Sequence, residues 1–196
     1  FSKAEKKVLL ALDDGHIEEM KKLSHTYFAP KEGESAEIVY PYRAKNEALI
    51  SATDVNYVGR AYDFVKAGGE YCGSMQVMKT ILQTDYLWNN IRVRGGAYGA
   101  FFTVERSGAA MFATYRDPHV ARSFDVIKNA GAFLANIDYD DKAMHKFIIG
   151  TISSLDMPLP PLAIARREFF AYQSGISFQE RLALRHEILS ATQQDI

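Results

Sequence analysis

The residues that most constrain the fold are 98–116, "YGAFFTVERSGAAMFATYR". Two runs rich in aromatic and β-branched residues flank Ser107-Gly108, a dipeptide short enough for a tight β-hairpin turn. Such a turn fixes two cross-strand pairs on one face of the sheet, which are Phe102 with Ala113 and Val104 with Met111. The chain is therefore expected to contain an antiparallel pair of strands.

A helix is predicted directly before this hairpin, over residues 74–92. Its apolar residues recur at helical spacing along one stripe, which is formed by Met75, Met78 and Leu82. Gly95 and Gly96 follow, and glycines just after such a segment are typical of helix C-termini. The stretch "RVRGGAYG", residues 92–99, is therefore predicted to be a helix-to-strand turn.

The N-terminal part of the chain is expected to hold a helical region and a first strand. Residues 4–23 are predicted to be helical, with a break near Gly15, and a polar connection at residues 29–35 follows. The stretch "NEALISATDVNYVGRAY", residues 46–62, is rich in Val, Ile, Thr and Tyr and predicts a strand.

From Asp117 onward the pattern changes to helices. Asp117 is expected to be the N-cap, with Pro118 at the first helical position. The buried side of this helix is predicted to carry Val120, Phe124, Ile127 and Leu134. A second helix from about residue 140 is predicted to bury Met144, Phe147, Ile148, Thr151 and Leu155. Two shorter helices follow, the last opened by a capping-box sequence at residues 177–180. Elements in this order predict an α+β fold, with a mostly antiparallel sheet covered by helices.

Composition excludes several classes of protein. With 196 residues, a net charge of −1, 47% hydrophobic and 12% aromatic residues, the chain has neither the basic excess of a nucleic-acid binder nor the polarity of a disordered segment. No apolar run approaches the ~18 residues of a membrane span. Because the sequence begins at Phe1, it is expected to be part of something larger, with residues 1–46 as a helical segment and connection and residues 47–196 as the α+β domain.

The residues give no catalytic centre or metal site within this chain. Residues 68–74 have the glycine spacing of a phosphate-binding loop but lack its lysine, and "GGAYG" precedes a strand instead of opening a helix. His16 and His186 each begin a near-match to a zinc motif whose second histidine is missing. The lone Cys72 favours a buried small hydrophobe over a reactive thiol.

Three segments together resemble the C-terminal part of pitrilysin/insulinase-type zinc metallopeptidases, in particular the presequence protease branch. They are "NEALISATDVNYVGRAYDF", "YLWNNIRVRGGAYGAFF" and "RDPHVARSFDVIKNAGAFL", and the resemblance extends over roughly residues 47–178. Its most specific element is an arginine followed six residues later by the tyrosine of "GGAYG", here Arg92 and Tyr98. In that family two similar α+β halves close around a peptide, and only the first half carries the zinc motif.

The resemblance implies that Arg92 and Tyr98 are catalytic residues of the complete enzyme, and that Gly95 and Gly96 join them in contacting substrate. A guanidinium offers several donors to a peptide carbonyl or a terminal carboxylate. A protonated phenol can donate a hydrogen bond to an oxyanion. From the residues alone, two ordinary interpretations remain open, in which Arg92 is a cation at a helix C-terminus and Tyr98 is a strand aromatic packed on the core.

The resemblance also implies a function for the chain as a whole. It is expected to be the C-terminal, substrate-positioning portion of a zinc metallopeptidase that hydrolyses unstructured peptides in a closed chamber, and to be inactive alone. Zinc is expected in the N-terminal half of the enzyme and not in this chain. The expected partners are the peptide and that N-terminal half, without nucleic acid or a membrane span, in the bacterial cytoplasm or a mitochondrial or other organellar matrix.

Two alternatives remain. The first is an inactive structural homologue of the same fold that acts in assembly, against which the retention of Arg92 and Tyr98 argues. The second is an unrelated small-molecule-binding α+β domain, against which the long match around "IRVRGGAYGAFF" argues.

Overall fold

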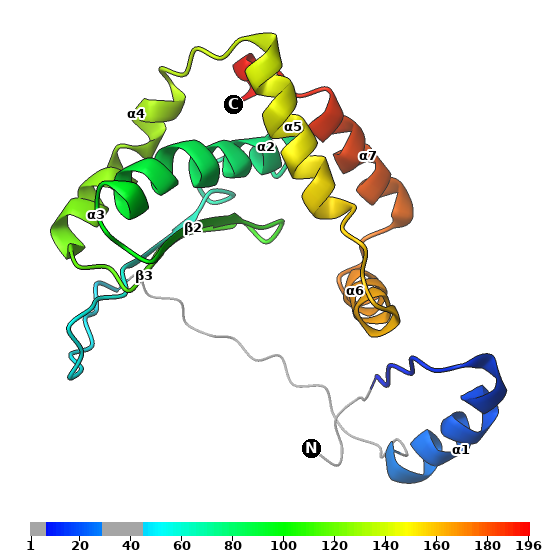
Figure 1. The fold of residues 1–196 in the computed structure, drawn as a ribbon. Helices are drawn as coiled ribbons and strands as arrows, with labels where there is room; N and C mark the ends of the chain where they lie inside the picture. Colours follow the sequence, from blue (N-terminus) through cyan, green and yellow to red (C-terminus); the bar gives the residue numbers. More distant parts are fainter. Residues whose placement is uncertain (1–6, 29–44) are drawn as a thin grey trace. The chain divides into compact units, whose positions relative to one another are not determined.

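The computed structural model describes residues 7–28 and 45–196 and divides into two compact units (Figure 1). The first unit comprises the described residues up to Ile50 together with Pro158–Ser177, and the second comprises Ser51–Met157 and Phe178–Ile196. The predicted domain boundary between residues 46 and 47 stays a prediction.

In the first unit, the short 3₁₀ turn η1 (Asp14–His16) leads into α1 (Ile17–Phe28), and α6 (Pro161–Gln173) is the second helix. The predicted break near Gly15 is therefore the start of the helix, because residues 7–13 are not helical. Leu9, Leu10 and Leu12 instead line a pocket together with Met20 and Leu162 and are partly buried there. The predicted polar connection at residues 29–35 lies outside the described residues.

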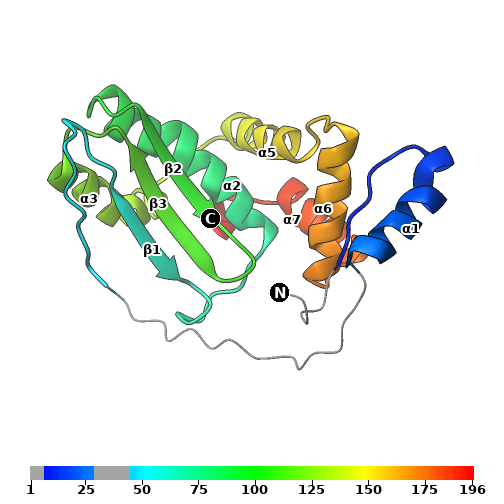
Figure 2. The same cartoon turned by 90° about the horizontal axis from the view of Figure 1, so that it is seen from below.

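The second unit contains a three-stranded antiparallel sheet in the order β1-β3-β2, which confirms the predicted α+β class. Its strands are β1 (Gly59–Asp63), β2 (Gly99–Val104) and β3 (Ala109–Tyr115). Figure 2 shows the helical segment of residues 73–93 behind one face of this sheet, with no element of the same unit over the other face. The predicted first strand is much shorter than residues 46–62, and Leu49 and Ile50 are fully exposed.

The hairpin forms where it was predicted, but its register is shifted by one residue. Phe102 lies opposite Phe112, and Val104 opposite Ala110. The shift arises because the turn has three residues and not two: the Glu105 N–H donates to the Ala109 carbonyl at 2.9 Å, and Gly108 takes a left-handed φ of 93°. The residues of β3 that share a sheet face with Phe102 and Val104 are therefore Phe112 and Ala110 in place of Ala113 and Met111, and this is the buried face.

The helix predicted over residues 74–92 forms as two continuous parts. The α-helix α2 (Gly73–Ile81) runs directly into the π-helix η2 (Leu82–Val93). On the sheet side, residues of η2 and of the strands form one buried cluster that includes Leu82, Leu87, Ile91, Phe102 and Phe112. On the other side, α2 packs with α5 (Asp141–Leu155) and α7 (Phe178–Leu189) around Val77, Ile81, Phe147, Ile148 and Ile188. These two clusters fix η2 above the sheet.

The helix after Asp117 is rotated and begins later than predicted. Its parts are α3 (Val120–Lys128), with His119 as N-cap, and α4 (Ala130–Leu134). Asp117 is 1% exposed, and its carboxylate accepts hydrogen bonds from the His119 N–H at 2.9 Å and the Ser123 hydroxyl at 2.5 Å. This buried carboxylate holds the polar Ser123 side of the helix inward, so Val120 and Phe124, predicted to be buried, are exposed, whereas Ile127 is buried as predicted.

The remaining predicted helices are found, with one further correction to their buried residues. Asp140 caps α5 by accepting a hydrogen bond from the Ala143 N–H at 2.8 Å. Leu155, predicted to be buried, lies in the last turn of α5 and is 45% exposed. The helix α7 begins at Phe178, directly after the predicted capping residue, and the short 3₁₀ turn η3 (Gln193–Asp195) follows it.

Candidate functional site

Arg92 stands in the last turn of η2, where its side chain stacks on an aromatic ring. The guanidinium carbon lies 3.9 Å from the centroid of the Trp88 ring, which is well within the range of a cation–π contact. Within residues 7–28 and 45–196, the guanidinium has no hydrogen-bond or ion-pair partner. One face of the cation is therefore covered while its N–H donors stay available to a ligand.

The turn after η2 needs glycine at both predicted positions, for two different reasons. A Cβ on the buried Gly95 would overlap the Ile91 carbonyl oxygen, so this residue must lack a side chain for the chain to pass. Gly96 is exposed and has a left-handed φ of 76°, which reverses the backbone direction. The Gly96 N–H donates to the Arg92 carbonyl at 2.9 Å, and the Ala97 N–H to that of Ile91 at 3.2 Å. These two hydrogen bonds hold the last turn of η2 and the residues that lead into β2 together.

Tyr98 stands at the entrance to β2 and is not a core residue. Its backbone N–H donates to the Tyr115 carbonyl at 3.1 Å and to the Arg116 carbonyl at 3.3 Å. Its side chain is 67% exposed and meets the ring of Tyr115 edge-on, with centroids 5.7 Å apart. Tyr115 in turn meets Tyr57 edge-on at 5.4 Å. The Tyr98 hydroxyl has no hydrogen-bond partner in the described part of the chain, so it can donate to a ligand.

Four arginines on this turn and on the elements next to it carry positive charge that no described carboxylate neutralises in an ion pair. The Arg122 guanidinium donates to the Arg94 carbonyl at 2.9 Å, and Arg116, at the end of β3, takes a φ of 49°, which is rare for a side-chain-bearing residue. Arg92, Arg94, Arg116 and Arg122 form no ion pair with any described residue. Four such cations favour the carbonyl oxygens or terminal carboxylate of a ligand.

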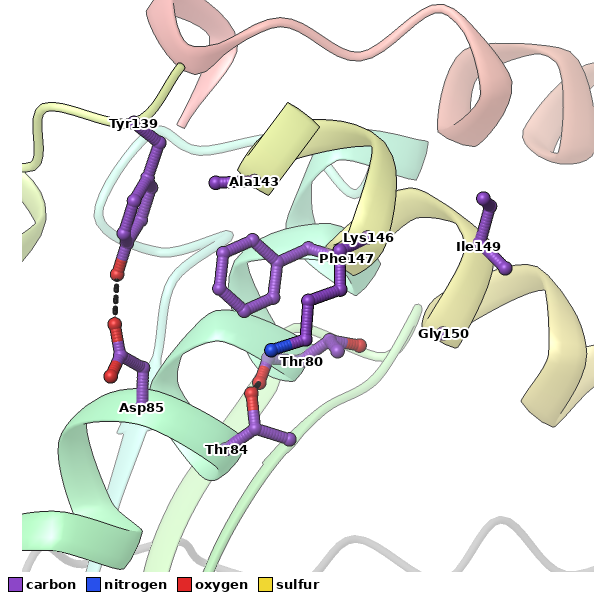
Figure 3. Close-up of a pocket in the computed structure, with 9 residues that line it drawn as sticks. All are labelled: Thr80, Thr84, Asp85, Tyr139, Ala143, Lys146, Phe147, Ile149 and Gly150. Carbon is purple, nitrogen blue, oxygen red and sulfur yellow. Dashed lines mark hydrogen bonds between the residues drawn. The ribbon is translucent and has the colours of Figure 1, made fainter. Parts of the chain in front are cut away.

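A cavity of about 520 Å³ lies elsewhere in the second unit, between η2 and α5 (Figure 3). Its hydroxyl and carboxylate groups have partners, whereas the Lys146 ammonium, which also lines it, has no hydrogen-bond or ion-pair partner among the described residues. The Tyr139 hydroxyl donates to the Asp85 carboxylate, and the Thr80 and Thr151 hydroxyls are 2.7 Å apart. Burial, and then the Asp85 contact, raise the pKa of Tyr139. Because the Tyr139, Asp85, Thr80 and Thr151 groups already have hydrogen-bond partners, we interpret the cavity as a seam, that is, a contact region between packed helices, and not as the functional site.

No group of three His, Cys, Asp or Glu side chains that could hold a metal ion occurs among residues 7–28 and 45–196. His16 lies in η1 and His186 in α7. No helix in the described ranges is long and apolar enough to cross a membrane.

Arg92, Gly95, Gly96 and Tyr98 stay predicted site residues, and the sequence prediction did not include the aromatic residues that contact Arg92 and Tyr98. Trp88 lies four residues before Arg92, which is the spacing at which helical side chains meet, and this signal was available in the sequence. Tyr115 and Tyr57 had no such signal, because their contact with Tyr98 depends on the strand register.

Comparison with known proteins identifies the family. Residues 46–196 match the family model described as PreP C-terminal domain, so the chain belongs to this family, a family of peptidases. It is 32% identical over 163 residues to protein HypA of Clostridium perfringens, which covers 83% of this chain and 17% of HypA. It is 36% identical over 152 residues to presequence protease 1, chloroplastic/mitochondrial, of Arabidopsis thaliana, covering 77% of this chain and 14% of that protein. The chain therefore spans a small fraction of the length of its curated relatives, and the predicted membership in the presequence protease branch is confirmed.

A solved structure shows the same fold. The periplasmic protease PqqL from Escherichia coli matches with a TM-score of 0.51 and 16% sequence identity, over 91% of this chain and 22% of PqqL. At this identity the match supports the pitrilysin-like fold and nothing beyond it.

The steric account of the turn predicts different effects at two glycines. Gly95→Ala should destabilise the protein by on the order of 2 kcal/mol or more, because the new methyl group overlaps the Ile91 carbonyl. Gly131→Ala in α4 is the control: nothing lies within 4 Å of its Cβ position, so this change should be neutral or slightly stabilising. Urea unfolding measures both, and equal midpoints for the two variants would contradict the account.

The contact between Tyr139 and Asp85 predicts a dependence of stability on alkaline pH. Because the folded state raises the pKa of Tyr139, the neutral phenol stabilises the fold fully below the unfolded tyrosine pKa of ~10, and this contribution is lost as pH rises through the folded value. Tyr139→Phe should therefore make the free energy of unfolding fall less steeply above about pH 10. Asp85→Asn should make the free energy of unfolding fall only somewhat less steeply with pH, because the phenol of Tyr139 stays buried. Identical slopes in wild type and Tyr139→Phe, measured by urea unfolding, would contradict this prediction.

Proposed function

We propose that this chain is the substrate-positioning C-terminal portion of a zinc metallopeptidase that hydrolyses unstructured peptides inside a closed chamber. The observation that carries the proposal is the pair of unpartnered donors on either side of one rigid turn, the Arg92 guanidinium and the Tyr98 hydroxyl. Membership of the chain in the PreP C-terminal domain family supports the reaction class.

The two side chains suit different tasks. Arg92 would bind a peptide carbonyl or a terminal carboxylate, in the positive environment made by Arg94, Arg116 and Arg122. Tyr98 would donate a hydrogen bond to the carbonyl oxygen on which negative charge develops during hydrolysis, a bond that strengthens toward the transition state. Gly95 and Gly96 would let the main chain approach the peptide closely, with Gly96 as the exposed member.

The described residues of this chain do not fit a zinc ion, since no three of their metal-ligating side chains come together. We propose that the zinc is bound by an N-terminal half of the complete enzyme, which is also the partner that closes over the peptide. We propose an organellar matrix or a bacterial cytoplasm as the location; the relative named as chloroplastic/mitochondrial supports the first, and the relative from Clostridium perfringens is bacterial.

The first consequence is that the 196-residue chain alone should bind no stoichiometric zinc and cleave no peptide. Metal analysis after dialysis and a fluorogenic peptide assay measure the two properties. Tight zinc at one ion per chain, or turnover that survives repurification and is abolished by a chelator, would contradict the proposal.

The second consequence concerns Tyr98 in the complete enzyme. Tyr98→Phe should lower kcat about a hundredfold, equivalent to ~3 kcal/mol, with a smaller effect on KM, because the lost hydrogen bond forms mainly in the transition state. Tyr62→Phe, on β1, is a matched control that should leave kcat unchanged. A Tyr98→Phe enzyme with normal kcat would remove this residue from the active site.

A third consequence separates Arg92 from Tyr98. Arg92→Ala should mainly raise KM, and Arg92→Lys should restore only part of the affinity because an ammonium cannot reproduce the planar fork. Arg166→Ala, in α6, serves as the control for loss of a surface arginine. If Arg92→Ala instead lowers the melting temperature while the folded enzyme keeps its specific activity, the residue is structural, as an inactive assembly homologue would require.

A further inference from the structure

Trp88 is a large aromatic residue in an unusual position. It is the single tryptophan of the chain and is 46% exposed, whereas its helical neighbours Leu87 and Ile91 are 1% and 2% exposed. The buried neighbours hold η2 against the core, so the indole contributes little to that core. Burial therefore does not explain why a tryptophan stands here.

The backbone of η2 directs Arg92 onto this ring. Side chains of a helix lean toward its N-terminus, so the side chain of Arg92 extends back over the residue four positions earlier. The i→i−5 bond from the Arg94 N–H to the Asn89 carbonyl, 3.0 Å long, keeps the helix regular through this segment. The guanidinium consequently lies over the indole ring, with its central carbon 3.9 Å from the ring centroid.

This stack restricts Arg92 without consuming its donors. A free arginine side chain samples many rotamers, and an ion pair would restrict it only by occupying the N–H groups that a ligand needs. Stacking instead uses the face of the cation and leaves the in-plane N–H groups open. A carboxylate partner would not have this property.

We propose that Trp88 is a positioning residue for Arg92, which holds the guanidinium in the orientation that receives a peptide carbonyl or carboxylate. This inference rests on the proposed function of Arg92. It assigns to Trp88 an effect on substrate affinity that acts through Arg92 and not through direct contact with the reacting atoms.

Kinetics of Trp88 variants in the complete enzyme test the proposal. Trp88→Leu, which keeps an apolar side chain but removes the aromatic face, should raise KM about two- to fivefold with little change in kcat. Trp88→Phe keeps a smaller aromatic face and should restore part of the affinity. Phe124→Leu, which removes another exposed aromatic residue from a helix of the same unit, is the control and should leave KM unchanged.

A double-mutant cycle separates this inference from the function on which it depends. If Trp88 acts through Arg92, then Trp88→Leu should have no further effect on KM in the Arg92→Ala background. Additive effects of the two substitutions on KM would overturn the positioning role of Trp88 alone. A normal KM for Trp88→Leu, in an enzyme whose KM rises with Arg92→Ala, would do the same. A normal KM for Arg92→Ala would instead overturn the proposed function. A fall in melting temperature with unchanged KM would make Trp88 purely structural.

Discussion

The passage of the backbone from η2 into β2 is the constraint on which the rest of the site depends. Gly95 must fit against the Ile91 carbonyl, and Gly96 must take a left-handed conformation, for the chain to leave a buried helix and enter a sheet within a few residues. Ile91 and Ala97, joined by a backbone hydrogen bond, are both buried on the core side. Arg92 and Tyr98, which flank this turn, consequently have fixed backbone positions, and the Arg92 N–H groups and the Tyr98 hydroxyl have no hydrogen-bond partner among the described residues.

The polar groups of the second unit are of two kinds, those that have a partner within the protein and those that have none among the described residues. In the seam between η2 and α5, each hydroxyl is paired, as with Thr80 and Thr151 or Tyr139 and Asp85. Such pairs hold helices together but offer little to a ligand. At the turn, by contrast, Arg92, Arg94, Arg116 and Arg122 have no acidic partner among the described residues, so their charge favours an anionic or carbonyl ligand. This contrast favours the turn over the cavity as the functional site.

The sequence alone predicted the elements whose signals are local. The hairpin, the helix that ends before Gly95 and the helix that begins at about residue 140 depend on neighbouring residues and were predicted correctly. Predictions that depended on one-residue precision or on tertiary contacts were wrong. The hairpin register changed because Gly108 allows a three-residue turn, and the face of α3 changed because the Asp117 carboxylate is buried with Ser123. The stacking partner of Arg92 was readable from spacing, whereas the contact of Tyr98 with Tyr115 required the strand register.

The central claim is that Arg92 and Tyr98 contact the substrate peptide, and a structure of the complete enzyme closed around an uncleaved peptide tests it most directly. The account predicts the Tyr98 hydroxyl within hydrogen-bond distance of the scissile carbonyl oxygen. It also predicts the Arg92 guanidinium, still stacked on Trp88, within the same distance of a peptide carbonyl or terminal carboxylate. A closed, peptide-bound enzyme in which both side chains face solvent or another part of the protein would contradict the account.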